Sequence, residues 1–300
     1  MKTAAALCVL LFACGGESQT ATPQTLPTTS TTSAPKTYAV HLSHPNRVGD
    51  RLRVVADKIE EKATKVTAGD VVIDDKHEKR IIHIDEISTV LAVNEQGRAT
   101  KTREDIADLT IDGKSVVKGA VEIVRAPKEK DAVITIDGKP ASEDARDALK
   151  SMLKLSSGGP TDDDVFGTKT PQAVGAHWAV NTQLAHDDLR DDTGLDASKV
   201  TGDIWLENVT SDGGKEALDV RAKLGLDGLV PPDVPQGSTV EMGRADVDLQ
   251  TMLPVDGRPE RLSERMSTAI TFRLRVKTAK GPALVVVTVS EKRDGKFSLP

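Results

Sequence analysis

The chain has few cysteine and few aromatic residues. Its 300 residues include two cysteines, Cys8 and Cys14, and aromatic residues make up 2% of the sequence. Two cysteines so close to the N-terminus exclude the disulfide framework that stabilises many small secreted domains. So few aromatic rings also disfavour stacking on sugars or nucleic-acid bases. Val, Ile and Leu must therefore supply the core, and segments rich in β-branched residues favour strands.

The sequence also lacks an excess of positive charge and a long apolar run. Its formal net charge is −6 and its pI is about 5.6, whereas a surface for nucleic acid needs a concentrated positive field. We therefore expect no nucleic-acid partner. The apolar stretch Ala4–Ala13 is far shorter than the roughly 20 residues that a membrane-spanning helix needs, so it does not predict one.

Instead, this stretch has the features of a cleaved export signal, because it follows Met1-Lys2 and ends in small residues. At its end, Leu11-Phe12-Ala13-Cys14 resembles the lipobox of bacterial lipoproteins, although Phe12 is bulkier than the residue usual there. The resemblance implies cleavage after Ala13 and acyl chains such as palmitate, including a diacylglycerol thioether, on Cys14. Two or three such chains anchor a protein stably to a membrane. The alternative is an ordinary signal peptide with an incidental cysteine.

A polar segment rich in Thr, Ser, Pro and Gln follows Cys14. Too few of its side chains are apolar to offset the entropy of ordering it, which predicts a disordered tether over residues 14–36, after a signal peptide over 1–13. Gly15 stands where an aspartate would change the sorting of a lipoprotein. The lipobox resemblance therefore implies a cell-envelope protein held, through lipid on Cys14, to the outer membrane.

Four short sequence words recur in the body of the chain in the same order. The pairs are Val48–Val54 with Val174–Val180, Leu109–Gly113 with Leu224–Gly228, Val121–Ala126 with Val240–Ala245, and Ile136–Pro140 with Val255–Pro259. Their nearly constant spacing predicts an internal duplication, with chance similarity of turn-flanked strands as the alternative. The breaker cluster Ser156–Pro160 then divides the body into halves over 37–157 and 158–300.

Both halves are predicted to consist mainly of antiparallel strands. Ile270–Val276 alternates apolar and polar residues, and Ala283–Val289 is a denser apolar run. Five Asp-Gly pairs predict turns between strands, at Asp112, Asp137, Asp227, Asp256 and Asp294. The last of these would close a hairpin with the 283–289 run.

One helix is expected near 142–155. Ser142 can cap its N-terminus. Its apolar stripe at helical spacing comprises Ala145, Leu149, Met152 and Leu153. The predicted fold class is therefore mainly β (α+β), with two sequence-related antiparallel halves.

Two β-rich halves that each open on a Val-Gly word are similar to a group of uncharacterised bacterial envelope lipoproteins, in which a Val-Gly-Asp-x-Trp word introduces the second half. Here Trp178 completes that word, but Ala176 replaces its aspartate, and Leu52 replaces the tryptophan in the first half. More distantly, a curved antiparallel sheet with a helix resembles the half-barrel of periplasmic lipoprotein carriers, which bind acyl chains on a concave apolar face. Neither resemblance implies an enzymatic activity.

Two groups of polar residues could bind a ligand or a metal. His83 and Asp85 would share one face of a strand, a spacing compatible with metal ligation or acid–base pairing. Asp187, Asp188 and Asp191 form an acidic cluster whose oxygens suit calcium. Neither group has a complete ligand set, and a polar strand face and solvated acidic turns explain them as well. We therefore expect no metal and no other cofactor.

The sequence contains no familiar catalytic motif, whether a Gly-x-Ser-x-Gly elbow, a phosphate loop or a His-Glu-x-x-His pair. The leading hypothesis is a non-enzymatic, membrane-anchored lipoprotein that binds a hydrophobic ligand or an envelope protein partner. One alternative is a structural or surface-display domain without a ligand, and a more remote one is a hydrolase that uses carboxylates such as Asp85 and Glu86. A concave apolar cavity would favour the binding of a ligand, and a packed interior would favour a display domain. Convergent buried carboxylates would favour catalysis.

Overall fold

The computed structural model describes residues 35–125, 132–153, 155, 158–193, 197–212, 215–231, 234, 236–259, 261–278 and 281–300. The fold belongs to the second of two units, Met1–Pro35 and Lys36–Pro300. The predicted signal peptide, Cys14 and nearly all of the predicted tether lie outside the described residues, as do Ser156 and Ser157.

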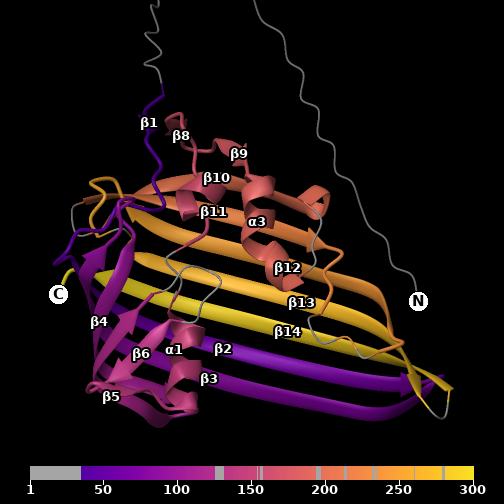
Figure 1. Ribbon diagram of the computed structural model, residues 1–300. Coiled ribbons are helices and arrows are strands. Elements are labelled where there is room, and N and C mark those ends of the chain that lie inside the picture. Colours follow the sequence, from indigo (N-terminus) through magenta and orange to yellow (C-terminus); the bar gives the residue numbers. More distant parts are fainter. Residues whose placement is uncertain are drawn as a thin grey trace, which may run out of the picture. The chain divides into compact units, whose positions relative to one another are not determined.

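One large antiparallel sheet forms most of this unit, which confirms the mainly β class (Figure 1). Its strands are β2 (Arg51–Ala68), β3 (Val71–Val93), β4 (Ala99–Ile111), β5 (Lys114–Val124), β6 (Val133–Ile136), β7 (Lys139–Pro140), β9 (His177–Ala179), β10 (Val200–Asp212), β11 (Lys215–Asp227), β12 (Thr239–Pro254), β13 (Ser263–Thr278) and β14 (Gly281–Ser298). These 12 strands lie in the order β7-β6-β5-β4-β3-β2-β14-β13-β12-β11-β10-β9. The pairing of β14 with β2 makes the sheet continuous across both halves of the chain.

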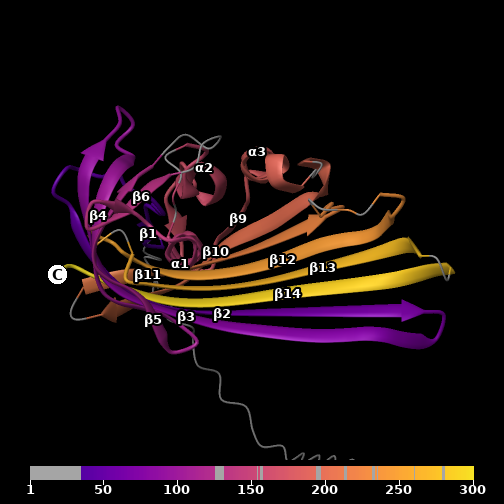
Figure 2. The same ribbon diagram turned by 60° about the horizontal axis from the view of Figure 1, so that its bottom comes forward.

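Three α-helices lie against one face of the sheet, which we call the inner face (Figures 1 and 2). They are α1 (Glu143–Met152), α2 (Asp162–Phe166) and α3 (Thr182–Thr193), and a short 3-10 helix, η1 (Ala197–Lys199), follows α3. Two short strands, β1 (Thr37–Tyr38) and β8 (Gln172–Ala173), pair with each other apart from the main sheet. None of the helices in the described residues is both long and apolar enough to cross a membrane.

The helix predicted near 142–155 is α1. The Ser142 side chain accepts a hydrogen bond from the Ala145 backbone, and Ala145, Leu149 and Met152 are buried as the stripe predicts. The helix ends at Met152 because Leu153 adopts an extended conformation. Sequence reasoning did not predict α2 and α3, so one expected helix becomes three.

Two apolar clusters pack on the inner face, one in each half. In the first, the buried side of α1 packs with strand residues that include Ile82, Ile84 and Leu109. In the second, Val165 of α2 and Ala185 of α3 pack with residues of β10 to β12. Burying these side chains stabilises the fold by about 25 cal/mol per Å² of apolar surface. Each half of the sheet thus has its own covered core.

The Asp-Gly predictions have mixed outcomes. Asp112-Gly113 and Asp137-Gly138 are two-residue hairpin turns in which both residues have positive φ, as type I′ turns require. Asp256 lies in the turn that follows β12. Asp227 ends β11, but a longer connection rather than a tight turn leads from it to β12.

The prediction of a turn at Asp294-Gly295 is wrong. Both residues lie inside β14, and Gly295 pairs with Glu264 of β13 and Ala56 of β2. A side-chain carbon at Gly295 would lie 3.2 Å from the Phe297 ring, so this glycine provides room for close packing rather than a reversal. β13 ends at Thr278 and pairs with β14, which begins at Gly281.

Candidate ligand-binding site

Residues 36–46, which precede β2, cross the inner face of the sheet, and we call them the strap. Val40 and Leu42 of the strap are buried in the apolar cluster of the second half. The Leu42 amide donates a hydrogen bond of 2.6 Å to Asp163 Oδ1 of α2. At the far end, the Asn46 amide donates to the Gly97 carbonyl at 2.7 Å. These contacts hold the strap over the sheet and beside α2.

Helix α2 is short and acidic, and each of its first three carboxylates has a structural role. Thr161 and Asp164 form a capping box, in which Asp164 accepts hydrogen bonds of 2.7 Å from the Thr161 amide and hydroxyl. These bonds lower the pKa of Asp164. Asp163 holds the strap, and Asp162 forms an ion pair with Arg261.

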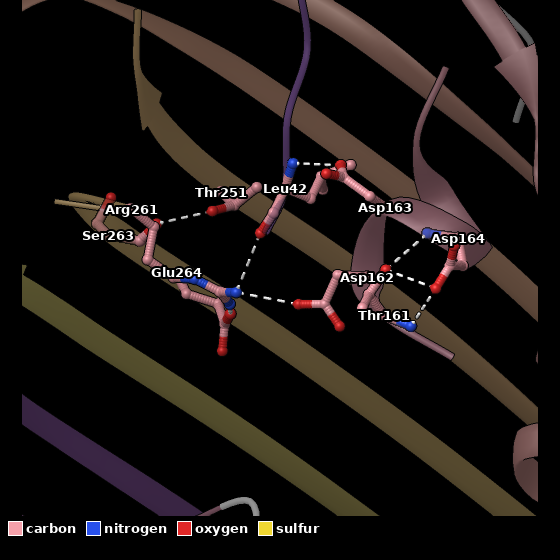
Figure 3. A network of polar contacts seen from close by, with 9 residues as sticks. All are labelled: Leu42, Thr161, Asp162, Asp163, Asp164, Thr251, Arg261, Ser263 and Glu264. Atoms are coloured by element: carbon pink, nitrogen blue, oxygen red, sulfur yellow. Dashed lines mark hydrogen bonds and ion pairs between the residues drawn. The ribbon is translucent and has the colours of Figure 1, made fainter. Parts of the chain in front are cut away.

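Arg261, in the connection between β12 and β13, joins the strap, α2 and the sheet (Figure 3). Its Nη2 lies 3.0 Å from Asp162 Oδ2 and 3.4 Å from the Leu42 carbonyl oxygen. Its Nη1 pairs with Glu264 of β13, and its guanidinium lies 5.9 Å from the centre of the Phe297 ring. Charge-assisted hydrogen bonds of this kind are about twice as strong as neutral ones. The Arg261 side chain is 19% exposed, so little water competes for these bonds.

We call Arg261 and its contacts with Leu42 and Asp162 the clamp. An apolar cavity of about 200 Å³ lies between the inner face and this clamp. The strap and α2 contribute Leu42 and Phe166, and the strands below contribute residues that include Leu224, Leu249 and Met266. Asp162 and Arg261 also line the cavity. We refer to this space as the apolar cavity.

A second hollow of about 530 Å³ shares Asp162 and Arg261 with the apolar cavity. Most of its other lining residues are polar, and we call it the polar chamber. They include His44 and Asn46 of the strap, Ser88 of β3, and Arg98, Thr102 and Arg125 at the β4 and β5 side. Its volume lies within the range of about 300–1,000 Å³ that is usual for ligand pockets.

Two buried carboxyl groups lie behind the polar chamber. Glu86 of β3 and Glu104 of β4 are each 1% exposed, and Oε2 of both has no hydrogen-bond partner. Burial raises the pKa of Glu86 well above its usual value, and the nearby Glu104 adds to this rise. Burial likewise raises the pKa of Glu104. Neither glutamate lines the apolar cavity or the polar chamber.

Arg125 connects these carboxyl groups to the polar chamber. Its Nη1 donates to Thr102 Oγ1 at 2.7 Å, and its Nη2 lies 3.8 Å from Glu104 Oε1. The Thr102 hydroxyl in turn donates to Glu104 Oε1. Burial lowers the pKa of Arg125.

The predicted pair of His83 and Asp85 lies elsewhere, on the outer face of β3. His83 Nδ1 lies 2.8 Å from Asp57 Oδ1, and Asp85 accepts two hydrogen bonds from Arg53. Each member of the pair therefore has its own partner on β2. Among the residues that the structure describes, no group of three or more His, Cys, Asp or Glu side chains is placed to hold a metal.

The predicted acidic cluster of Asp187, Asp188 and Asp191 lies in α3, not in a solvated turn. Asp187 Oδ1 accepts a hydrogen bond from Gln183 Nε2 at 3.0 Å and lies 3.1 Å from His186 Nδ1. The side chains of Asp188 and Asp191 are outside the described part of the chain, as is Cys14.

From the sequence, Glu86 was considered as a hydrolase carboxylate and Asp162–Asp164 as a possible calcium cluster, but neither was predicted to border a ligand site, and the other residues here were not identified. Glu86 continues the buried alternation of Ile82 and Ile84, and Glu104 alternates with Thr102 and Ile106 in the same way. That period of two was a usable signal, because it places both carboxyl groups on the covered face. No sequence pattern predicted the contacts of Arg261 with Leu42 and Asp162, because both residues are far from it in the sequence.

Comparisons with known proteins give no family for this chain. No protein-family model matches it, and no curated protein matches it significantly. Among solved structures, an outer membrane channel from Pseudomonas putida F1 aligns at 11% identity and a TM-score of 0.16, covering 88% of this chain and 99% of that one. MucB, solved in complex with MucA(peri), aligns at 11% identity and a TM-score of 0.17, covering 81% of this chain and 89% of that one. Scores this low support no assignment.

Proposed function

We propose that the protein is a non-enzymatic lipoprotein of the bacterial envelope that holds a hydrophobic ligand between the inner face of its sheet and the strap. The observation that carries this proposal is the apolar cavity, which is roofed by the strap and α2 and floored by β11 to β13. An apolar hollow with a few polar groups at its edge is the usual form of a small-molecule site. A display domain without a ligand would have no need of it.

The membrane anchor is part of the same proposal. The lipobox at Leu11–Cys14 would place acyl chains on Cys14, and the polar tether would separate them from the folded unit that begins at Lys36. Gly15, which stands in place of an aspartate, would direct the anchored protein to the outer membrane. An envelope protein partner would then have access to the tethered body.

We also retain the internal duplication in the proposal, and matching backbone contacts support it. Gly49, with φ of 89°, donates to the Val90 carbonyl at 2.9 Å, and Gly175, with φ of 83°, donates to the Leu206 carbonyl at 2.8 Å. The amides of Val90 and Leu206 donate back to Asp50 and Ala176, each the residue after the glycine. Both Val-Gly words therefore begin their half with the same local hydrogen-bond pattern.

The buried carboxyl groups favour a structural role over hydrolysis. A hydrolase needs its carboxyl groups within hydrogen-bond reach of the substrate. Glu86 and Glu104 lie behind Thr102 and Arg125 and line neither hollow. Asp85, the other carboxylate considered for catalysis, is paired with Arg53 on the outer face.

A variant that fills the apolar cavity tests the proposal. Leu249 lines it, so Leu249→Trp should weaken binding of N-phenyl-1-naphthylamine, an uncharged apolar dye, by about tenfold or more as apolar contact is lost. Dye fluorescence, titrated on the full chain carrying Cys14→Ser so that no detergent is needed, measures the affinity.

Leu284→Trp is the matched control, because Leu284 lies on the opposite face of β14 and lines neither hollow. It should leave dye binding unchanged. If the parent chain shows no saturable binding, or if both variants reduce it equally, the proposed ligand site is wrong.

A further inference from the structure

The apolar cavity and the polar chamber adjoin each other but differ in chemistry. They share Asp162 and Arg261, and the strap and the α2 segment contribute lining residues to both. One is lined mainly by aliphatic side chains and Phe166, the other by arginine, hydroxyl and amide groups. A ligand that occupied both would need an apolar end and a polar end.

Arg98, which lies just before β4 in the wall of the polar chamber, differs from three arginines of the sheet that hydrogen-bond to an aspartate. Arg53, Arg221 and Arg244 each form two hydrogen bonds with one aspartate. Arg98 donates one hydrogen bond to the Gly159 carbonyl, and its buried Nε has no partner. Within the described residues, its guanidinium forms no direct ion pair, and its charge helps to lower the pKa of Asp164 at the start of α2.

Arg125 lies close to Arg98 in the chamber wall. Its backbone amide donates to the Thr100 carbonyl at 2.8 Å, which places it beside the chain just after Arg98. Ser88 and Thr102 also line the chamber, and the hydroxyls of both form hydrogen bonds with Glu104. Burial raises the pKa of Glu86 and of Glu104, the carboxyl groups nearest to Arg125.

The two acidic residues that line the chamber have partners of their own. Asp162 is paired with Arg261, and Asp163 accepts the Leu42 amide. Burial, with a contribution from His41, lowers the pKa of His44, so that its ring favours the neutral form. The β4 and β5 side of the chamber therefore holds the two arginines Arg98 and Arg125. Guanidinium groups match the planar geometry of carboxylates and phosphates.

We propose that the ligand is an anionic amphiphile, whose carboxylate or phosphate head lies in the polar chamber against Arg98 and Arg125 and whose apolar tail enters the apolar cavity past Arg261. This inference rests on the proposed function and adds the charge of the ligand. It also gives a role to Arg98, whose buried Nε is otherwise unused.

The test compares three probes with the same twelve-carbon tail: dodecanoate, dodecyl phosphate and 1-dodecanol. Each displaces N-phenyl-1-naphthylamine from the full chain carrying Cys14→Ser, below its critical micelle concentration. At least one anionic probe should bind about tenfold or more tightly than the alcohol, as a charge-assisted contact predicts. The preference between the two anions identifies the head group.

Arg98→Gln should remove most of that preference and leave 1-dodecanol binding unchanged. Arg103→Gln is the control, because Arg103 lies in β4, which begins just after Arg98, but is exposed and paired with Asp105. Equal affinities for all three probes, or an equal loss for the alcohol and the anions in Arg98→Gln, would overturn the anionic head group. If none of the three probes binds, the proposed function itself is wrong.

Discussion

At the scale of residues, the buried carboxyl groups of Glu86 and Glu104 are the most unusual feature of the inner face. Each occupies a position that the strand alternation reserves for an apolar side chain, and each has an oxygen without a partner. The alternation could have been read from the sequence. Their proximity to each other and to Arg125 could not, because it depends on the register between β3, β4 and β5.

Glu86 should make the stability of the fold depend on pH. Its pKa in the folded state is raised above the usual 4.5, so its contribution is fully present below about pH 4.5 and is lost as the pH rises through the folded-state value. Glu86→Gln removes the ionisable group. It should raise the free energy of unfolding at pH 8 by about 1 kcal/mol relative to the parent, and change it little at pH 4.

Urea unfolding of both proteins at the two pH values measures this difference. A change of equal size at pH 4 and pH 8 would show that Glu86 does not titrate with folding. Glu86→Ala is a less useful variant, since it would also leave a cavity in the core.

At the scale of elements, the sequence predicted those whose signal is local. The period of two in Ile270–Val276 became β13, and Ser142 with its apolar stripe became α1. The Asp294-Gly295 turn was wrong because ladder bonds from strands on both sides, which are distant in the sequence, outweigh local turn preference. α3 was not predicted from the sequence, because its clustered acidic residues were interpreted as a solvated turn.

The apolar side of α1 should be a major source of stability in the first half. Met152 is 1% exposed and packs in the cluster with Ile82 and Leu149, so Met152→Ala should lower the free energy of unfolding by about 2–5 kcal/mol. Asp147→Ala, on the exposed side of the same helix, should change it by less than about 0.5 kcal/mol. Thermal or urea unfolding distinguishes them, and equal effects would mean that α1 does not pack as described.

At the scale of the whole folded unit, the continuous sheet is the feature that no local pattern could have predicted. It depends on the last strand, β14, pairing with β2, which begins more than two hundred residues earlier. That pairing places the strap, α2 and the β12–β13 connection together on one face. The clamp at Arg261 and both hollows follow from this long-range arrangement.

Native mass spectrometry of the Cys14→Ser chain, isolated from cells without detergent, examines the anchor and the ligand together. We expect this chain to leave the membrane fraction, because it lacks the acyl anchor, and to carry one non-covalently bound amphiphile that Leu249→Trp displaces. A chain that stays in the membrane would contradict the lipid anchor. A soluble, folded chain with no bound small molecule would contradict the ligand site.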